Sequence, residues 1–306
     1  MISIVIALFN KENFITETIQ SVLNQTFTDF ELLIVNDGST DNSLKIAQSF
    51  NDKRLKLISI ENSGVSIARN TGIKATKHNW IALLDADDWW EPTFLEEIVE
   101  AINLFPNHKL FAGGRSRVFK SQVERYQHKF LPEEGKTKVI NYYKVISKYL
   151  PLINSSNVVI DNSLFKTKGY FREGQINHED QDLWMRLCVN EEVVFINKNL
   201  SFYRKTEEIT ASTIYYNADD FCLFLETILK VNKQLTKTER KYFKDYYNKF
   251  ILLTYIKNYG NYSKEGENKV FQLILKIITG KQLLLVRLLR VLPFKKKYLF
   301  LKYFKR

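Results

Sequence analysis

The sequence of 306 residues contains only two cysteines, Cys188 and Cys222. Two cysteines are too few for a disulfide framework and lack the spacing of a metal site, so we expect a reducing compartment and two core residues. No uninterrupted apolar run reaches about 18 residues, so the sequence predicts no membrane-spanning helix. The apolar stretch 1–9 has no basic segment before it and no small-residue cleavage site, which favours a first β-strand over a signal peptide.

Acidic residues are absent from one end of the sequence. Residues 281–306 hold nine Lys and Arg, and therefore carry +9 of the net charge of +11. The other 280 residues carry +2, so the basic character belongs to one segment with its own role. Internal repeats and low-complexity segments are also absent. The length favours one large globular domain, or one domain with an appendage.

Strand-like and helix-like patterns alternate through the first 116 residues. Short β-rich runs predict strands at 2–8, 30–35, 55–60 and 80–84. Apolar residues at helical spacing predict helices at 14–23, 43–50, 65–76 and 93–105. This alternation indicates βαβ units, and we therefore expect an α/β fold with a mostly parallel, Rossmann-like sheet flanked by helices.

The remaining sequence is less regular. It predicts strands at 110–119, 193–196 and 201–203 and a helix at 179–189. After about residue 215 the pattern is helical throughout. We therefore expect an α/β domain over 1–214 and a helical C-terminal region over 215–306.

Polar residues follow the four predicted parallel strands at the point where each strand ends. They are Asn10, 36–39, 61–62 and 85–88. In open α/β sheets the carboxyl ends of the strands form the ligand crevice. Four strand ends with such residues are a stronger signal than any one of them.

The most acidic of these strand ends is Asp85-Ala86-Asp87-Asp88. Three carboxylates within four residues repel one another, and oxygen ligands of this kind suit a hard cation such as Mg²⁺ or Mn²⁺ completed by phosphates and waters. The alternative is a solvated acidic turn. Trp89 and Trp90, which follow, either pack in the core or form the floor of a sugar site.

Two other strand ends offer contacts to a nucleotide. Asp37 leaves a buried strand, and its carboxylate can accept hydrogen bonds from a base or a ribose, whereas 39–41 reads as an ordinary turn and helix cap. The stretch 62–72 opens a helix whose N-terminus favours anions. Arg69 on this helix is either a surface arginine or a guanidinium beside a diphosphate.

Two later stretches allow two interpretations each. Glu179 and Asp180 begin a helix. They either stabilise its N-terminus, or one of them acts as the general base for an incoming hydroxyl, and the sequence favours neither interpretation. Arg204 and Lys205 follow a short strand. They are either solvated cations at a sheet edge or a second contact to phosphate.

Taken in order, these motifs resemble the inverting family 2 glycosyltransferases of the GT-A fold, bacterial enzymes that build surface polysaccharides. The matching stretches are 3–10, 21–26, 31–41, 62–72, 85–88 and 179–186. The resemblance covers roughly residues 1–215. It implies a nucleotide-sugar-binding and catalytic GT-A domain over 1–214.

The resemblance also implies a role for each candidate residue. The expected donor contacts are Ala7, Phe9, Asn10, Asp37, Asn62, Arg69, Asp85 and Arg204. Asp87, together with Asp85, would bind the metal, Mn²⁺ or Mg²⁺, that bridges the donor diphosphate. Asp180 matches the catalytic base, and Glu179 would shape the acceptor site. Asp180 would deprotonate an acceptor hydroxyl that attacks the anomeric carbon, with inversion of configuration.

Three departures from the family pattern stand out. Leu8 and Phe9 replace the common Pro and Tyr, which removes a hydroxyl. Lys205-Thr206-Glu207 stands where many members carry a His, so the sequence offers no His there for a contact to phosphate or metal. The Gln-x-x-Arg-Trp signature of processive synthases is absent, which favours transfer of a single sugar.

The basic segment 281–306 combines leucines and arginines with a later run of lysines and aromatic residues. This composition predicts a helix lying on an anionic membrane. The alternatives are a packing helix with a solvated basic end, and a nucleic-acid arm, which the aliphatic density disfavours.

We therefore expect a glycosyltransferase that is cytoplasmic and peripherally associated with the inner face of the cytoplasmic membrane. Family frequency makes a UDP-sugar the expected donor, with a glycan or polyprenyl-diphosphate-linked acceptor and no nucleic acid. One competing hypothesis is a nucleotidyltransferase, for which the sequence lacks a Gly-rich signature or lysine to hold a nucleoside triphosphate. The other is a catalytically inactive, membrane-associated member of the same fold, against which Asp85, Asp87 and Asp180 argue.

Overall fold

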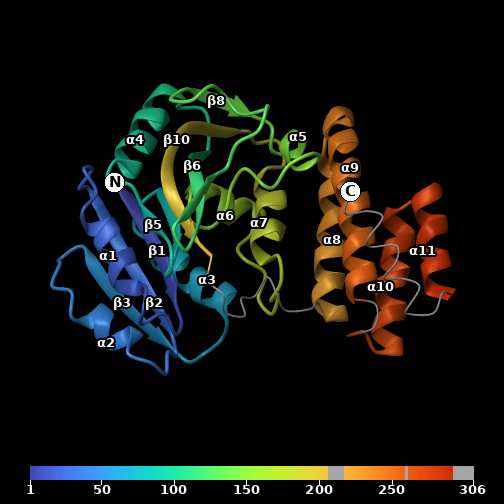
Figure 1. Ribbon diagram of the computed structural model, residues 1–306, viewed down its shortest axis with the longest axis horizontal. Helices are drawn as coiled ribbons and strands as arrows, with labels where there is room; N and C mark the ends of the chain where they lie inside the picture. The colour runs from blue at the N-terminus through green and yellow to red at the C-terminus, as the bar shows by residue number, and fades with distance from the viewer. Residues whose placement is uncertain (206–216, 259–260, 292–306) are drawn as a thin grey trace.

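A computed structural model describes residues 1–205, 217–258 and 261–291, and its framework is one mixed sheet (Figure 1). The strands are β1 Ile2–Leu8, β2 Phe30–Asp37, β3 Leu55–Ile60, β4 Trp80–Asp85, β5 Trp89–Trp90, β6 Leu110–Phe119, β7 Gln122–Arg125, β8 Thr137–Ile140, β9 Val158–Asp161 and β10 Val193–Arg204. Their order is β3-β2-β1-β4-β9-β6-β10-β5, while β7 pairs with β6 and β8 with β10. The first four strands run parallel, as the alternating pattern predicts.

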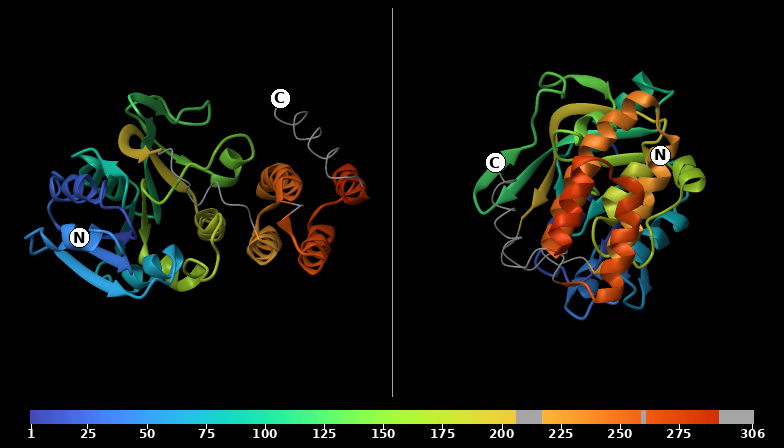
Figure 2. Two further views of the ribbon diagram at one scale, coloured as in Figure 1. Left: turned by 60° about the horizontal axis from the view of Figure 1, so that its bottom comes forward. Right: turned by 90° about the vertical axis from the view of Figure 1, so that its right-hand side faces the viewer.

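Helices cover both faces of this sheet, and the C-terminal helices pack at one end of the sheet domain (Figure 2). They are α1 Ile15–Leu23, α2 Ser43–Gln48, α3 Val65–Ala75, α4 Phe94–Leu104, α5 Tyr142–Ile146, α6 Asn162–Lys168, α7 Glu179–Leu187, α8 Ala218–Gln234, α9 Lys237–Asn258, α10 Lys264–Ile277 and α11 Lys281–Val291. Side chains alternate across each strand, so Ile4 and Ile6 of β1 join a core with α1, α2 and α4. Val5 points to the opposite face and joins a second core with α3 and α7.

The sheet register brings the polar strand ends together. Leu8 of β1 lies opposite Asn36 of β2, and Ala7 lies opposite Asp85 of β4. The strand order reverses around β1, because β2 and β3 lie on one side of it and β4 on the other. A crevice at such a reversal is the usual ligand site of an open α/β sheet.

The predicted strands and helices of the first 116 residues are confirmed. The later part contains β7, β8, α5 and α6, which the sequence interpretation did not predict, and it differs in two further ways. The two strands predicted at 193–196 and 201–203 form one strand, β10, whose register against β6 is irregular between Ile196 and Ser201. The short β9, which the sequence interpretation did not predict, is inserted antiparallel between β4 and β6.

The C-terminal helices share the second core. Phe224 and Leu225 of α8 belong to the same buried cluster as Leu183 and Trp184 of α7. The views in Figure 2 show these helices standing side by side at one end of the sheet domain. The division at 214/215 falls in residues that the structure does not describe, and it stays a prediction.

Helix α11 packs by one face only. Val286 is fully buried, whereas Leu284 and Leu288, one turn apart, are 60% and 52% exposed. Residues 292–306 of the predicted basic tail lie outside the described residues. Across the described ranges, we find no helix with the length and apolar character needed to cross a membrane. Of the two free cysteines, Cys188 is buried as expected and Cys222 is half-buried.

Candidate functional site

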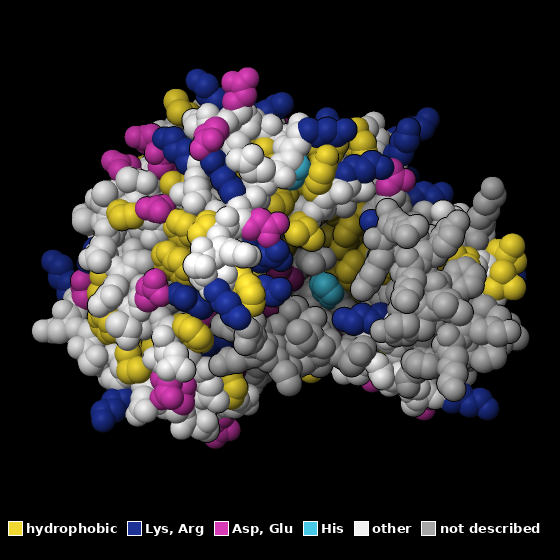
Figure 3. All heavy atoms as spheres, viewed as in Figure 1, with side chains coloured by type: hydrophobic (Ala, Val, Ile, Leu, Met, Phe, Trp, Pro, Cys, Tyr) yellow, Lys and Arg dark blue, Asp and Glu magenta, His cyan; other side chains and the backbone are white. Residues whose placement is uncertain are grey.

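A cavity of about 450 Å³ opens where the end of β4 faces the start of α7. Figure 3 shows a hollow near the middle of this face, with Lys and Arg side chains beside acidic ones at its edge. Its lining residues come from α3, β4, β6, β7, α7, β10 and the loops around 150–155 and 176–178: Arg69, Asp85, Arg115, Arg117, Glu124, Arg125, Tyr126, Leu150, Asn154, Ser155, Ile176, Asn177, His178, Glu179, Asp180, Gln181 and Tyr203. Four predicted site residues therefore line one cavity. They are Arg69 of α3, Asp85 of β4, and Glu179 and Asp180 of α7.

The loops after β1 and β2 are tied to each other at the carboxyl ends of these strands. Asn10 adopts a left-handed backbone conformation with a φ of 50°, which asparagine tolerates better than most residues. Its Oδ1 accepts a hydrogen bond from the Thr40 backbone N–H at 2.9 Å. Its own N–H donates to the Ser39 Oγ at 3.2 Å. Ala7 lies one residue before the end of β1, and the exposed Phe9 comes directly after the strand.

Asp37 holds the loop that opens α3. Its carboxylate, 3% exposed, accepts hydrogen bonds from the backbone N–H groups of Ser63 at 2.8 Å and Gly64 at 2.9 Å. Gly38 next to it has a φ of +68°, and a Cβ there would come within 2.8 Å of the Asn62 backbone nitrogen. The predicted donor contacts Asp37 and Asn62 therefore belong to one closely packed strand edge.

The stretch Asp85-Ala86-Asp87-Asp88, called the acidic turn below, has three carboxylates with different partners. Asp85 accepts from Arg69 Nη2 at 2.7 Å, and Asp87 accepts from Lys11 Nζ at 2.6 Å. Asp88 is buried, where it accepts from the Ser156 hydroxyl and from the Arg204 backbone N–H. Burial, and then the charges of Asp87 and Asp85, raise the pKa of Asp88 well above its ordinary value. Asp88 thus anchors the turn, while Asp85 lines the cavity and Asp87 pairs with Lys11.

Lys11 is a site residue that the sequence interpretation missed. It follows Asn10 at the predicted crevice edge, and this position was the available signal. Its ammonium also lies 5.9 Å from the centre of the Phe14 ring. The acidic turn therefore faces a lysine from the loop after β1.

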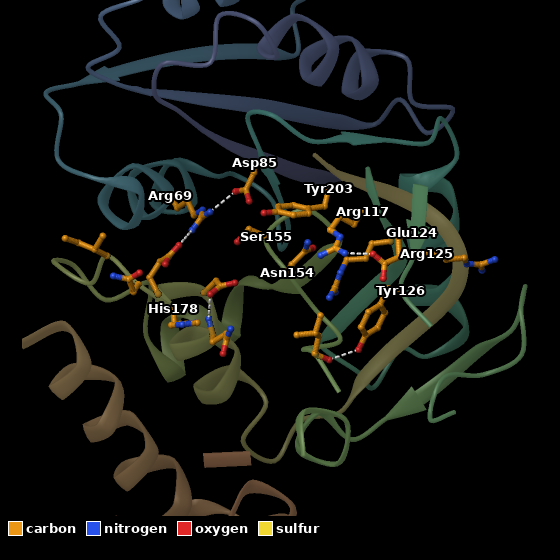
Figure 4. A pocket seen from close by; sticks show the side chains of 17 residues that line it. Arg69, Asp85, Arg117, Glu124, Arg125, Tyr126, Asn154, Ser155, His178 and Tyr203 are labelled. Atoms are coloured by element: carbon orange, nitrogen blue, oxygen red, sulfur yellow. Dashed lines mark hydrogen bonds and ion pairs between the residues drawn. The ribbon is translucent and has the colours of Figure 1, made fainter. Parts of the chain in front are cut away.

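Arg69 joins the acidic turn to α7. Its Nη2 contacts Asp85 and its Nη1 contacts Glu179 Oε1 at 3.0 Å (Figure 4). The side chain is 8% exposed and lies over the Phe171 ring at 5.0 Å, so it is not a surface arginine. Burial opposes the charge, but the carboxylates of Asp85 and Glu179 outweigh it and raise the pKa of Arg69.

Glu179 and Asp180 begin α7 at the cavity wall. The preceding residue, His178, has a φ of 54°, an unfavourable backbone conformation of the kind found at functional sites. Burial, then the charge of Asp180, raises the pKa of Glu179 to about 7. Burial also raises the pKa of Asp180, although its carboxylate accepts a hydrogen bond from the Gln181 N–H at 2.6 Å. This pair can take up a proton near neutral pH.

Arg204 lies against the back of the acidic turn. Its Nε donates to the Asp87 carbonyl at 3.0 Å, and its guanidinium pairs with Glu17 and lies 4.5 Å from the Trp89 ring centre. Trp90 instead packs in the core, where its Nε1 donates to the Ser156 carbonyl at 2.6 Å. Of the variant motif 205–207, the last two residues lie outside the part of the chain that the structure describes.

The loop Asn154-Ser155-Ser156-Asn157 also builds the site, although sequence reasoning missed it. Asn154 and Ser155 line the cavity, and Ser156 contacts both Asp88 and the backbone N–H of Asp85. A polar run between the apolar stretches 150–153 and 158–160 was the signal.

The acidic turn fits a divalent cation in its chemistry. Carboxylate oxygens are the ligands that Mg²⁺ and Mn²⁺ prefer, and the positive groups of Arg69 and Lys11 already lie on Asp85 and Asp87. Within the described ranges, no cluster of three or more His, Cys, Asp or Glu side chains could by itself hold a metal ion. Phosphates and waters would therefore supply the remaining ligands.

Comparison with known proteins gives a consistent result. The family model "Glycosyl transferase family 2" matches residues 3–170. "Glycosyltransferase GlyA" of Streptococcus pneumoniae is 27% identical over 215 residues, which are 66% of this chain and 30% of GlyA. "Putative glycosyltransferase EpsH" of Bacillus subtilis is 41% identical over 100 residues, 32% of this chain and 29% of EpsH. The chain thus spans less than a third of either relative's length.

A solved structure shows the same fold. The crystal structure of S. aureus TarS 1–349 in complex with UDP-GlcNAc superposes with a TM-score of 0.71 at 18% identity. The match covers 90% of this chain and 80% of that chain. It confirms the predicted GT-A fold, including the helical C-terminal region.

Proposed function

Because the chain belongs to glycosyl transferase family 2, we propose that it moves a single sugar from a nucleotide-sugar to an acceptor hydroxyl with inversion of configuration. The observation that carries this proposal is the position of Arg69. Its guanidinium contacts Asp85 on the strand-end side and Glu179 on the α7 side, within one cavity. A donor held at the strand ends would therefore lie beside the candidate base, Asp180.

The donor side is assigned to the carboxyl ends of β1, β2 and β4. The proposed contacts are Ala7, Phe9, Asn10, Asp37, Asn62, Arg69, Asp85 and Arg204. A UDP-sugar is the proposed donor, and the TarS complex with UDP-GlcNAc supports this choice. The loops that Asn10 and Asp37 fix give this side a preformed shape.

Asp87, helped by Asp85, is the proposed holder of Mn²⁺ or Mg²⁺. A cation bound there supplies positive charge to the departing diphosphate. Lys11 and Arg204 add positive charge from the protein itself, since both contact Asp87. This arrangement would stabilise the nucleotide as it leaves.

Asp180 is the proposed general base. Its carboxylate takes the proton of the acceptor hydroxyl while that oxygen forms a bond to the anomeric carbon. The bond from this carbon to the diphosphate oxygen breaks, and the nucleotide leaves with the electron pair. Attack opposite the leaving group inverts the configuration. Glu179, ion-paired to Arg69, would shape the acceptor side of the cavity.

We also propose peripheral attachment to the inner face of the cytoplasmic membrane, where a polyprenyl-diphosphate-linked or other glycan acceptor would be met. Leu284 and Leu288 on the exposed face of α11 support this, next to the exposed Arg287. Co-sedimentation with anionic vesicles tests it. We expect a Leu284→Gln/Leu288→Gln variant to bind less, and equal binding would refute a role for this face.

A donor panel tests the central proposal. Calorimetry with UDP, GDP, dTDP and CMP sugars, each with and without Mn²⁺, should show binding of one nucleotide class. NMR of a transferred sugar should then give the anomeric configuration opposite to that of the donor. No binding of any nucleotide-sugar would contradict the proposal, and a retained configuration would contradict the single-displacement mechanism.

A further inference from the structure

The cavity has a basic wall opposite the acidic turn. Arg115 and Arg117 lie two residues apart on β6, so their side chains leave the same face of the strand. Both line the cavity, with the aromatic rings of Tyr126 and Tyr203 beside them. Figure 4 shows Arg117 and Tyr126 across the cavity from Arg69 and Asp85. None of these four wall residues has a role in the donor contacts above.

Arg115 is a half-buried cation with donors to spare. Its Nη1 donates to the Leu152 carbonyl at 3.0 Å and its Nη2 to the Pro151 carbonyl at 2.8 Å. A guanidinium has five N–H donors, and these two carbonyls do not use all of them. Along the described chain, no carboxylate lies within ion-pair distance of it. A half-buried guanidinium that is bonded to two neutral backbone carbonyls can take a phosphate anion as its charge partner.

Arg117 has a weak partner. It pairs with Glu124, but the side chains are 50% and 70% exposed, and ion pairs of this kind contribute little. Glu124 lies at the cavity edge, so its carboxylate can turn into solvent when another anion arrives.

We propose that Arg115 and Arg117 bind a phosphate group of the acceptor, so that the acceptor is a phosphate-bearing glycan or lipid rather than a neutral sugar. Two guanidinium groups on one strand face match the several oxygens of a tetrahedral phosphate better than the two oxygens of a carboxylate. The phosphate would sit at the basic wall while the accepting hydroxyl reaches Asp180 on α7. This inference rests on the proposed function, because it assigns the acceptor half of the same cavity.

Neighbouring residues provide matched variants. Arg125 on β7 also pairs with an exposed glutamate, Glu134, but its guanidinium turns toward Asn197 and away from Arg117 (Figure 4). Arg125→Gln therefore removes the same charge from the same hairpin without touching the basic wall. Glu124→Gln removes the acid that competes with the phosphate, and it should improve binding, an effect that misfolding cannot produce.

The test is calorimetry with small probes while UDP and Mn²⁺ are saturating. Glycerol 3-phosphate should bind, and glycerol and glycerate should not. Arg117→Gln should weaken binding about 10- to 100-fold, as expected for a charged hydrogen-bonded pair. Glu124→Gln should strengthen it, and Arg125→Gln should weaken it less than Arg117→Gln does, because Arg125 lines the same cavity but its guanidinium turns toward Asn197. Equal binding of glycerate, or an equal loss in Arg125→Gln, would overturn the proposal.

Two further arms separate the alternatives. A polyprenyl diphosphate in detergent micelles should follow the same order of variants if the phosphate comes from a lipid, and tighter binding than glycerol 3-phosphate would identify that source. UDP binding is measured alone first. If UDP fails to bind, the proposed function fails; if UDP binds and no phosphate probe does, only this inference fails.

Discussion

The two sides of the cavity use carboxylates in opposite ways. At the strand ends, Asp37 accepts two backbone hydrogen bonds and Asp87 contacts Lys11, so these acids hold loops and cations in place. On α7, Glu179 and Asp180 lie in a poorly solvated wall, and burial raises the pKa of both. The same chemical group serves as an anchor on one side and as a proton acceptor on the other, because the surroundings differ.

Arg69 makes the two sides interdependent. It is buried and contacts one acid from each, so a change on either side alters the charge that the other experiences. Variants that remove one acid at a time should separate the two roles.

The largest effect is expected for Asp180→Asn. The amide keeps the shape of the side chain but cannot accept the hydroxyl proton, and general-base contributions are about 10²- to 10⁴-fold. We expect transfer to fall within that range while donor affinity stays the same. Rates at saturating donor, together with calorimetry, measure both quantities.

Glu173→Gln serves as the control, because this exposed acid lies in the same segment but outside the cavity. Near-normal transfer by Asp180→Asn would mean that another group is the base.

A smaller effect is expected for Asp87→Asn on the opposite side. Losing the carboxylate removes the main proposed metal ligand, and we expect metal-dependent UDP binding to weaken about 10- to 100-fold, the usual size for a charged hydrogen-bonded pair. UDP titrations with and without Mn²⁺ measure it. An unchanged Mn²⁺ effect would rule out the metal role of Asp87.

The strand-end side could be predicted from the sequence largely because its information is local. In the sequence, a polar residue stands at or just after the end of each of these strands. The parallel register then brings Asn10, Asp37 and Asp85 to one edge of the sheet. The resemblance supplied the roles. The environment of Arg69 was not predictable, since its partner Glu179 is 110 residues away.

The other side depends on long-range packing. Strand β9 has only four residues, and it belongs to the sheet because β4 and β6 pair with it on both edges. The loop 154–157 reaches Asp88 only after that pairing is made. A single-sequence pattern records hydrophobic periodicity, not which strand will lie between two others.

The pH dependence of stability should distinguish the two sides. The pKa of Glu179 is about 7 in the folded chain against 4.5 ordinarily. Between these values the unfolded chain releases the proton and the folded chain retains it, so this residue lowers stability as pH rises through that window. Glu179→Gln removes the titration, and its Tm relative to the wild type should therefore increase from pH 4.5 to pH 7.

Thermal unfolding at constant ionic strength measures this difference. Glu124→Gln, an exposed acid of the same cavity, is the matched control. A Tm difference for Glu179→Gln that falls with pH would contradict the raised pKa.

The smallest expected effect concerns Lys11→Met. In the structure the ammonium occupies Asp87 Oδ2 at 2.6 Å, an oxygen that a metal would also use. Removing this cation should strengthen Mn²⁺ binding a few-fold in the absence of nucleotide, because a partly exposed ion pair contributes only about 0–1 kcal/mol. Electron paramagnetic resonance of free Mn²⁺ measures the affinity without any need for turnover. If the affinity instead falls, Lys11 holds the acidic turn in its binding shape, and the strand-end side is organised by the lysine and not by the carboxylates alone.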